Sequence, residues 1–236
     1  MRVHVFLTPG EVDPAVVQEA TVVVVDVIRA TTSMVEALAN GARAIYPVAS
    51  AEEAVRLATS LGREDTLLAG ERKGLRVEGF DLGNSPAEFT REVVEGKRLV
   101  MSTSNGTVAL AQVQDVPRVV VGAFTNLEAV AGAVAHDGAL AVLCAGRLGR
   151  FALDDALFAG HLIRRLGTEV ELNDAARAVH ALAGAFPAGT EALTATDAGR
   201  AVIDIGFGPD LEVCGDVDRH AVVPEMRDQA LVLAGG

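Results

Sequence analysis

The stretch that decides the fold is TVVVVDVIRATT, residues 21–32. Four consecutive valines before Asp26 predict a strand buried on both faces, because a strand covered by helices on both sides does not alternate apolar and polar residues. The residues that follow, Thr32–Asn40, have a helical pattern. Asp26 and Arg29 are therefore expected at the carboxyl end of the strand, where open α/β sheets bind ligands. The alternative is that the two charges only pair with each other.

The same order of strand and helix repeats along the chain. We expect strands at Arg2–Leu7, Thr21–Val27, Ala44–Val48, Thr66–Ala69, Arg98–Ser102, Arg118–Ala123 and Ala139–Cys144. Between them we expect helices at Thr32–Asn40, after an N-cap at Ser50, and at Ala87–Val94, Thr107–Val113, Asn126–Ala135 and Asp155–Leu166. This alternation predicts an α/β fold of three layers, α/β/α, with a mostly parallel or mixed central sheet. Residues 1–236 fit one domain, and a C-terminal subdomain from about residue 167, helical as far as Ala185, is the alternative.

Composition restricts the partners. A net charge of −12 and an aromatic content of 4% argue against nucleic acid, which is bound by clustered cations and stacked rings. Cys144 and Cys214 lack metal-ligand spacing, so we expect two reduced core thiols. The chain shows no signal peptide and no apolar run that could span a bilayer, so we expect a cytoplasmic protein without a membrane partner, either alone or as a homo-oligomer.

Four strand-to-helix loops carry most of the unusual polar residues and glycines. They span residues 26–32, 70–86, 102–107 and 144–155. If the strands are parallel, all four loops meet at one edge of the sheet. The 102–107 loop, STSNGT, offers hydroxyls and backbone amides before a helix, an arrangement that binds phosphate or carboxylate oxygens, although an ordinary helix cap would use the same residues.

Charged residues in these loops indicate a site for a metal and an anion. Asp26, Glu71, Asp81 and the Asp154–Asp155 pair offer hard oxygen ligands, and Mg²⁺ takes one or two protein carboxylates and completes its shell with water and substrate phosphate. Asp155 could instead cap a helix, and the GERKG segment around Glu71 could be a solvated hairpin-like turn. Arg29, Arg72 and Arg147 are candidate clamps for phosphate, carboxylate or sulfonate oxygens.

Five ordered segments resemble the family of 2-phosphosulfolactate phosphatases, the magnesium-dependent enzymes that make sulfolactate on the route to coenzyme M. These segments are DVIRATTSMVEALANGA from Asp26, GERKG from Gly70, GFDLGNSPAEF from Gly79, STSNGT from Ser102 and CAGRLGRFALDDALFAG from Cys144. DIGFGPD near Asp204 and VVP at 222–224 extend the likeness toward the C-terminus. The chain departs from the family at Lys73, where a glycine is usual, and at Asp154, where a glutamate is usual.

The resemblance implies a phosphoric monoester hydrolase that uses Mg²⁺ and acts on a small phosphorylated 2-hydroxy acid. Asp26 is then the nucleophile or a metal ligand, Glu71 and Asp81 are ligands or the general base, and Arg29 completes the catalytic set. The expected metal ligands are Asp26, Glu71, Asp81 and Asp155. Substrate contacts are expected from Thr31, Thr32, Arg72, Asn84, Ser104, Asn105, Gly106, Thr107, Gly146 and Arg147.

Three other functions compete with this one. A haloacid-dehalogenase-type phosphatase also carries an Asp after a valine-rich strand, but it has a second Asp two positions on, where this chain has Ile28. A methyltransferase or nucleotide-cofactor enzyme is suggested by the glycine loop at 144–146, yet the chain lacks G-x-G-x-x-G. A noncatalytic binder of small phosphorylated or sulfonated acids would use the same four loops.

Overall fold

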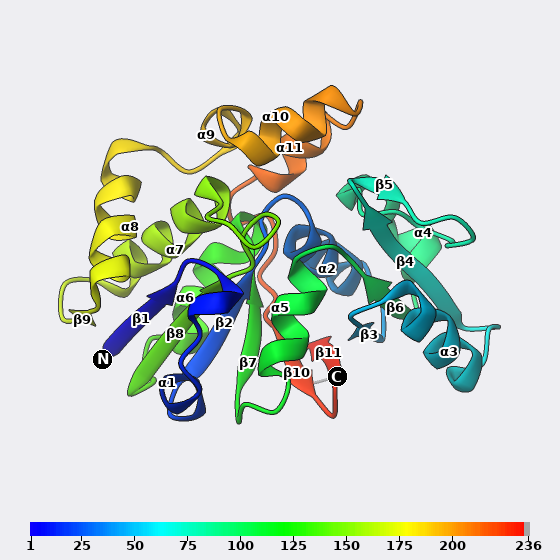
Figure 1. Ribbon diagram of the computed structural model, residues 1–236, viewed down its shortest axis with the longest axis horizontal. Helices are drawn as coiled ribbons and strands as arrows, with labels where there is room; N and C mark the ends of the chain where they lie inside the picture. The colour runs from blue at the N-terminus through cyan, green and yellow to red at the C-terminus, as the bar shows by residue number, and fades with distance from the viewer. Residues whose placement is uncertain (234–236) are drawn as a thin grey trace.

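The protein, described over residues 1–233 by a computed structural model, is built on one mixed sheet between two layers of helices (Figure 1). The strand order of this eleven-stranded sheet is β5-β4-β6-β3-β11-β10-β7-β2-β8-β1-β9. The strands are β1 (Arg2–Phe6), β2 (Thr21–Val25), β3 (Ala44–Pro47), β4 (Thr66–Arg72), β5 (Leu75–Arg76), β6 (Arg98–Ser102), β7 (Val119–Gly122), β8 (Ala139–Cys144), β9 (Glu171–Leu172), β10 (Pro224–Arg227) and β11 (Ala230–Leu233). The predicted three-layer α/β/α fold is confirmed.

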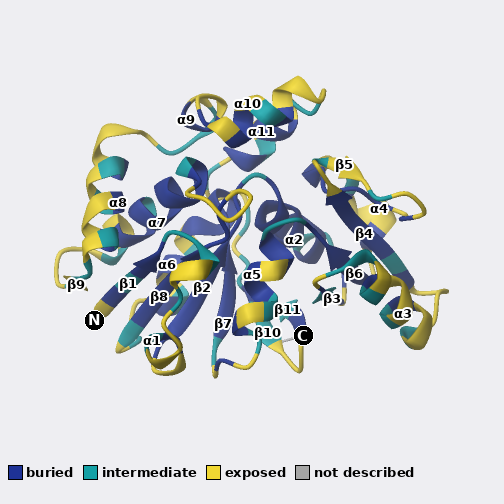
Figure 2. Cartoon of the chain, in the orientation of Figure 1, coloured by how far each residue is buried: buried dark blue, intermediate teal, exposed yellow. Residues whose placement is uncertain are grey.

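The helices cover both faces of the sheet. They are α1 (Pro14–Gln18), α2 (Ala30–Ala39), α3 (Ala51–Leu61), α4 (Arg91–Val94), α5 (Gly106–Val113), α6 (Leu127–Val134), α7 (Leu153–Leu166), α8 (Asp174–Ala185), α9 (Thr190–Thr194), α10 (Asp197–Asp204) and α11 (Asp210–Cys214), with 3-10 turns η1 (Pro9–Glu11), η2 (Pro86–Glu88) and η3 (Phe124–Asn126). In Figure 2 the central strands are buried, while α3 and α8 turn exposed faces outward. No helix in residues 1–233 is long and apolar enough to cross a membrane.

The valine strand lies near the middle of the sheet and is buried along its whole length. β2 pairs in parallel with β7 on one side and β8 on the other. Val22 and Val24 pack in the core beneath α2 and α5, whereas Val23 and Val25 pack in the core beneath α6 and α7. Both faces therefore bury apolar side chains, as the uninterrupted run of valines predicts.

A C-terminal hairpin, which the sequence analysis did not predict, completes the centre of the sheet. β10 and β11 pair antiparallel with each other, and each also pairs antiparallel with an inner strand, β10 with β7 and β11 with β3. The hairpin thus separates two parallel groups of strands, β4-β6-β3 and β7-β2-β8-β1. Its two-residue turn, Asp228 and Gln229, has φ angles of 49° and 64°.

Several element boundaries differ from the prediction. β4 runs on to Arg72, beyond the expected end at Ala69, and forms an antiparallel hairpin with β5. The helix expected at Ala87–Val94 is instead a 3-10 turn and the short helix α4. The Ser50 N-cap is confirmed, because its hydroxyl accepts a hydrogen bond from the Glu53 amide at 3.1 Å.

The last three helices, α9 to α11, lie above the carboxyl edge of the sheet (Figure 1). They belong to the region that the sequence analysis considered as a C-terminal subdomain. We call residues 190–214 the cap. Its position matters because the carboxyl edge is where the four polar loops meet.

Candidate active site

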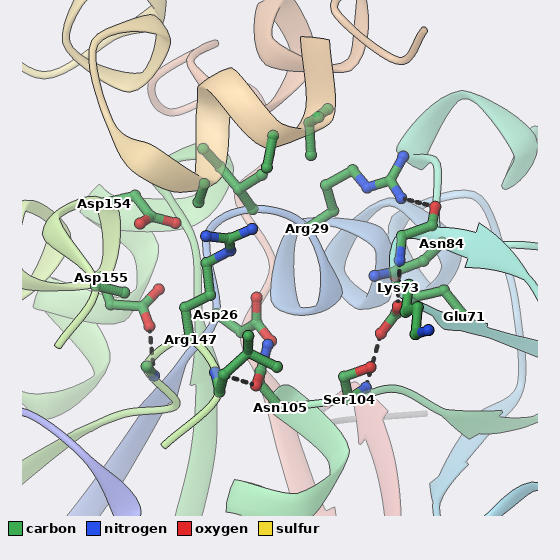
Figure 3. A pocket seen from close by; sticks show the side chains of 18 of the residues that line it. Asp26, Arg29, Glu71, Lys73, Asn84, Ser104, Asn105, Arg147, Asp154 and Asp155 are labelled. Carbon is green, nitrogen blue, oxygen red and sulfur yellow. Dashed lines mark hydrogen bonds between the residues drawn. The ribbon is translucent and has the colours of Figure 1, made fainter. Parts of the chain in front are cut away.

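A cavity of about 290 Å³ lies between the carboxyl edge of the sheet and the cap. All four polar loops contribute to its wall, as parallel strands require. The expected site residues that line it are Asp26, Arg29, Glu71, Asn84, Ser104, Asn105, Gly146, Arg147 and Asp155. The loops come from both parallel groups of strands, so the cavity spans the boundary between them. Figure 3 shows Asp154 and Asp155 at one end, Lys73, Glu71 and Asn84 at the other, and Asp26 and Arg147 between them.

Asp26 is the first residue after β2, and its backbone is held firmly. The Thr31 hydroxyl accepts a hydrogen bond from the Asp26 amide at 3.0 Å and donates to the Asp26 carbonyl at 2.8 Å. A Cβ added at Gly106 would lie 2.8 Å from Asp26 Oδ2 and 2.7 Å from the Cβ of Ala30. Gly106 is thus needed so that the start of α5 can approach the carboxylate closely.

The Asp26 carboxylate is 6% exposed and is hard to ionise. Burial, with the negative charges of Asp154 and Glu71, raises its pKa from 3.8 to about 7, against the opposing hydrogen bonds from the Ala30 and Gly106 amides. Burial likewise raises the pKa of Asp154 to about 6, although the Arg147 cation opposes this shift. Two buried carboxyl groups that resist ionisation form a site where a cation would be strongly favoured.

The neighbouring carboxylates Asp154 and Asp155 differ in their hydrogen bonds. Asp155 accepts hydrogen bonds from the Val27 amide through Oδ1 and from the Gly146 amide through Oδ2, both at 2.9 Å, and so ties the end of β2 to the loop after β8. Asp154 lines the cavity, and its Oδ1 is buried without a hydrogen-bond partner in the described part of the chain. The free oxygen belongs to Asp154, whereas the sequence analysis selected Asp155 as the metal ligand.

Glu71 links the β4–β5 hairpin to the loop after β6 by hydrogen bonds. Its Oε1 accepts from the Ser104 amide and its Oε2 from the Gly74 amide, each at 2.7 Å. The strands approach so closely there that a Cβ at Gly70 would lie 2.1 Å from the Ser102 carbonyl oxygen. The hairpin-like turn considered for this segment is present, and it forms one wall of the cavity.

Arg29 does not pair with Asp26. Its Nη1 donates to Asp210 Oδ2 at 2.7 Å, its Nη2 donates to the Gly74 carbonyl at 2.7 Å, and its guanidinium carbon lies 4.6 Å from the centre of the Phe207 ring. Arg29 therefore joins the β2 loop, the β4–β5 hairpin and the cap around the cavity. Arg147 lines the cavity between the end that holds Asp154 and the end that holds Glu71 (Figure 3). Its positive charge is close enough to lower the pKa of Asp154.

Six expected site residues do not line the cavity: Asp81, Thr31, Thr32, Arg72, Gly106 and Thr107. The Asp81 carboxylate pairs with Arg63 at 3.1 Å and accepts from the Leu68 amide, near the other end of β4. Arg72 donates to the Ser102 hydroxyl and carbonyl. The Thr32 hydroxyl donates to the Val27 carbonyl, and the Thr107 hydroxyl bonds within its own helix cap. The hydrogen bonds of these side chains hold the loops in place, as do those of Thr31.

The structure adds residues that the sequence analysis did not select. Lys73, at the tip of the β4–β5 hairpin, lines the cavity. So do Asp154, at the opposite end (Figure 3), and the apolar residues Ile28, Leu148, Ala198, Ala201, Val202 and Ile205. The cap residues lie about 170 positions from Asp26 and belong to an apolar helix face, so no local sequence signal places them here. Lys73 could have been found, because it directly follows the predicted site residues Glu71 and Arg72.

The site suits a hard divalent cation held by few protein ligands. Within residues 1–233 no cluster of three or more His, Cys, Asp or Glu side chains is arranged to bind a metal by itself. Mg²⁺ does not require one, since it keeps several waters and binds through one or two carboxylates plus substrate phosphate. Asp26 and Asp154 are the two buried carboxyl groups that could hold such an ion, and Asp154 Oδ1 has no hydrogen-bond partner among the described residues.

Comparisons with a family model and with individual proteins all point to the same family. The family model described as 2-phosphosulpholactate phosphatase matches residues 6–229. A protein of Caldanaerobacter subterraneus named "Probable 2-phosphosulfolactate phosphatase" is 34% identical over 232 residues, which cover 97% of this chain and 96% of the relative. Proteins with the same name from Carboxydothermus hydrogenoformans and Clostridium perfringens are 37% identical over 228 residues (95% of this chain, 93% of the relative) and 41% identical over 183 residues (75% and 74%).

Proposed function

The chain belongs to the 2-phosphosulpholactate phosphatase family and is a phosphoric monoester hydrolase, and from this we propose that it hydrolyses 2-phosphosulfolactate to sulfolactate and phosphate with Mg²⁺. The observation that carries the proposal is the pair of buried carboxyl groups, Asp26 and Asp154, whose pKa values burial raises to about 7 and about 6. We place this reaction in the cytoplasm, on the route to coenzyme M, as the family resemblance suggests.

The position of the two carboxylates supports a phosphoryl group bound near Asp26. Mg²⁺ held by Asp26 and Asp154 would neutralise charge on the phosphoryl oxygens during transfer. Without a cation, two carboxylates in a buried site would repel a phosphate dianion, so a phosphoryl group near Asp26 requires positive charge. Arg147 supplies part of it from the adjacent wall of the cavity, where its guanidinium can donate two parallel hydrogen bonds to phosphoryl oxygens.

The remaining polar residues keep this geometry fixed. Thr31 holds the backbone of Asp26, Asp155 holds the loop of Arg147, and Glu71 holds the loop of Ser104. Phosphoryl transfer depends mainly on positioning and charge neutralisation, so such buried anchors contribute to the rate by keeping the loops of the site in place. The cap supplies apolar side chains on the remaining wall, which limits the access of water to the reacting groups.

A phosphate-release assay tests the proposal. Purified protein is incubated with 2-phosphosulfolactate, with Mg²⁺ or with EDTA, and inorganic phosphate is measured over pH 6 to 9. We expect release that depends on Mg²⁺. Binding of the ester without release of phosphate under any of these conditions would instead identify a noncatalytic binder of phosphorylated acids.

A further inference from the structure

The end of the cavity opposite Asp154 has its own polar groups, and the proposed hydrolysis gives two of them, Lys73 and Asn84, no role. Lys73, Asn84 and Glu71 lie at this end in Figure 3. They come from the β4–β5 hairpin and from the segment after it, which returns beside β4, because the Gly70 amide donates to the Gly83 carbonyl at 3.0 Å. This end of the cavity is thus built by one strand group, whereas Asp26 and Asp154 come from the other.

Lys73 brings a cation to this end. Its backbone adopts a left-handed conformation with φ of 54°, at the tip of a hairpin that both Glu71 and Arg29 anchor through Gly74. The neighbouring carboxylate, Glu71, already accepts two backbone amides, and the Lys73 ammonium takes part in none of the ion pairs of 4.0 Å or less found among residues 1–233. The positive charge of Lys73 is thus available to a ligand.

Asn84 supplies a second, independent sign of a ligand. Its side chain is 6% exposed and lines the cavity, yet Oδ1 is buried without a hydrogen-bond partner in the described residues. A buried amide oxygen without a partner costs free energy, so it indicates a ligand group that pairs with the carboxamide, either a donor to this oxygen or, with the amide turned, an acceptor for its NH2 group. The carboxamide carries both an acceptor and two donors, and a half-turn about its last bond exchanges them with little change of shape.

We propose that Lys73 and Asn84 form a subsite for the acid end of the substrate, a carboxylate or sulfonate that the reaction leaves unchanged. This inference rests on the proposed function. The oxoacid oxygens receive hydrogen bonds from the Lys73 ammonium and the Asn84 amide, while the phosphoryl group lies at the Asp26–Asp154 end beside Arg147. A cavity of about 290 Å³ suits a substrate of this small size, because pockets for drug-sized ligands start near 300 Å³. Lys73 and Asn84 are then specificity-determining residues.

Kinetics of Lys73→Met test the subsite, because methionine keeps the length of the side chain and removes its charge. The probes are 2-phosphosulfolactate, 2-phospholactate, which lacks the sulfonate, 2-phosphoethanesulfonate, which lacks the carboxylate, and a simple alkyl phosphate, which lacks both. We expect the preference in kcat/KM for 2-phosphosulfolactate over the alkyl phosphate to fall at least tenfold, mainly through KM. The singly acidic ester that shows the same loss carries the group that Lys73 binds.

Two further variants support the interpretation. Asn84→Asp is nearly isosteric and places a negative charge in the subsite, so it should raise KM for the acidic esters at least as strongly as Lys73→Met. Lys97→Met is the matched control, because Lys97 is the only other lysine of the chain. It pairs with Asp65 at 3.0 Å, at the end of β4 and β6 that is opposite to the hairpin tip. Lys97→Met should leave the substrate preference unchanged.

Chemical labelling provides a test that does not depend on turnover. With two lysines in the chain, an amine-acylating reagent followed by mass spectrometry reports each one separately. Sulfolactate, the product, should slow the acylation of Lys73 severalfold and leave that of Lys97 unchanged.

The outcomes separate the two hypotheses. If the unmodified protein releases no phosphate from any ester, the proposed function fails, while protection of Lys73 by sulfolactate would still support the subsite. If phosphate is released but Lys73→Met weakens the use of all four esters equally or of none, and sulfolactate gives no protection, the subsite is wrong.

Discussion

Arg29 and Asp210 lie 181 positions apart in the chain, and Arg29 Nη1 donates to Asp210 Oδ2 across 2.7 Å. Both side chains are buried, 2% and 5% exposed, and Asp210 Oδ1 also accepts from the Ser85 hydroxyl at 2.6 Å. The carboxylate therefore attaches the cap to two loops of the site at once. Removing the charge of one partner of a buried ion pair is costly, because the other charge then stays buried without a partner.

Asp210→Asn should accordingly destabilise the protein by about 3 kcal/mol and lower kcat/KM at least tenfold. Urea unfolding gives the first quantity and phosphate release the second. Glu95→Gln is the control, because Glu95 forms an exposed pair with Arg91 at the outer end of α4. An Asp210→Asn protein as stable as the control would show that the cap is not attached through this pair.

Asp26→Asn should remove activity by about a thousandfold or more and at the same time stabilise the protein in EDTA at pH 8. The stabilisation follows because the substitution removes a buried charge that Asp154 and Glu71 repel. Phosphate release and thermal unfolding measure the two effects. Labelled phosphate trapped on the protein, and lost in Asp26→Asn, would identify Asp26 as the nucleophile; without label, Asp26 remains a metal ligand.

The stability of the metal-free protein should fall as pH rises from about 4 to about 7. Between the ordinary pKa of Asp26, 3.8, and its raised value of about 7, the folded protein binds the proton more tightly than the unfolded chain. This stabilisation is complete at low pH and is lost as pH passes the folded-state pKa. Mg²⁺ should then raise the melting temperature more at pH 8 than at pH 5; equal shifts would contradict binding at Asp26 and Asp154.

Gly106→Ala should lower activity at least tenfold, because its new Cβ would lie 2.8 Å from Asp26 Oδ2 and displace the carboxylate. Gly132→Ala is the matched control, since Gly132 lies in α6 with open space around its Cβ position. That control should keep full activity and gain up to about 1 kcal/mol of stability from better helix propensity. Full activity in Gly106→Ala would show that the close approach of α5 to Asp26 is not needed.

Asp81→Asn should keep kcat within about twofold of the unmodified protein, because the structure places this carboxylate beside Arg63, away from the cavity. Thermal unfolding should show a small loss, since the Leu68 amide keeps an acceptor in the amide oxygen of asparagine. A loss of activity comparable with that of Asp26→Asn would return Asp81 to the catalytic set.

The local sequence pattern predicted the parallel strands and the loops of the site, because buried valine runs and the caps between them are short-range signals. The hairpin β10–β11 escaped prediction for two physical reasons. Each strand has four residues, and the turn uses Asp228 and Gln229 at positions where Asn-Gly or Asp-Gly is the usual signal.

The choice between neighbouring site residues was not predictable from sequence. Asp154 and Asp155 are chemically identical and adjacent, and only the backbone amides of Val27 and Gly146 decide which carboxylate is already occupied. The same holds for Arg29, whose partner Asp210 was hidden in a distant segment. Hydrogen-bond partners that are remote in the chain carry no local signal, so a set of candidate residues could be predicted but not their division of labour.

The hairpin β10–β11 also has a consequence for how the sheet assembles. It contains the last described residues, 224–233, yet it supplies the hydrogen bonds between the strand group that carries Glu71 and the group that carries Asp26. The two groups have no other hydrogen bonds between them among the described strands, so they cannot join into one sheet until this hairpin has inserted between β7 and β3. The active site is therefore expected to form only once the hairpin is in place, and a chain truncated before residue 224 should be inactive however well its earlier part folds.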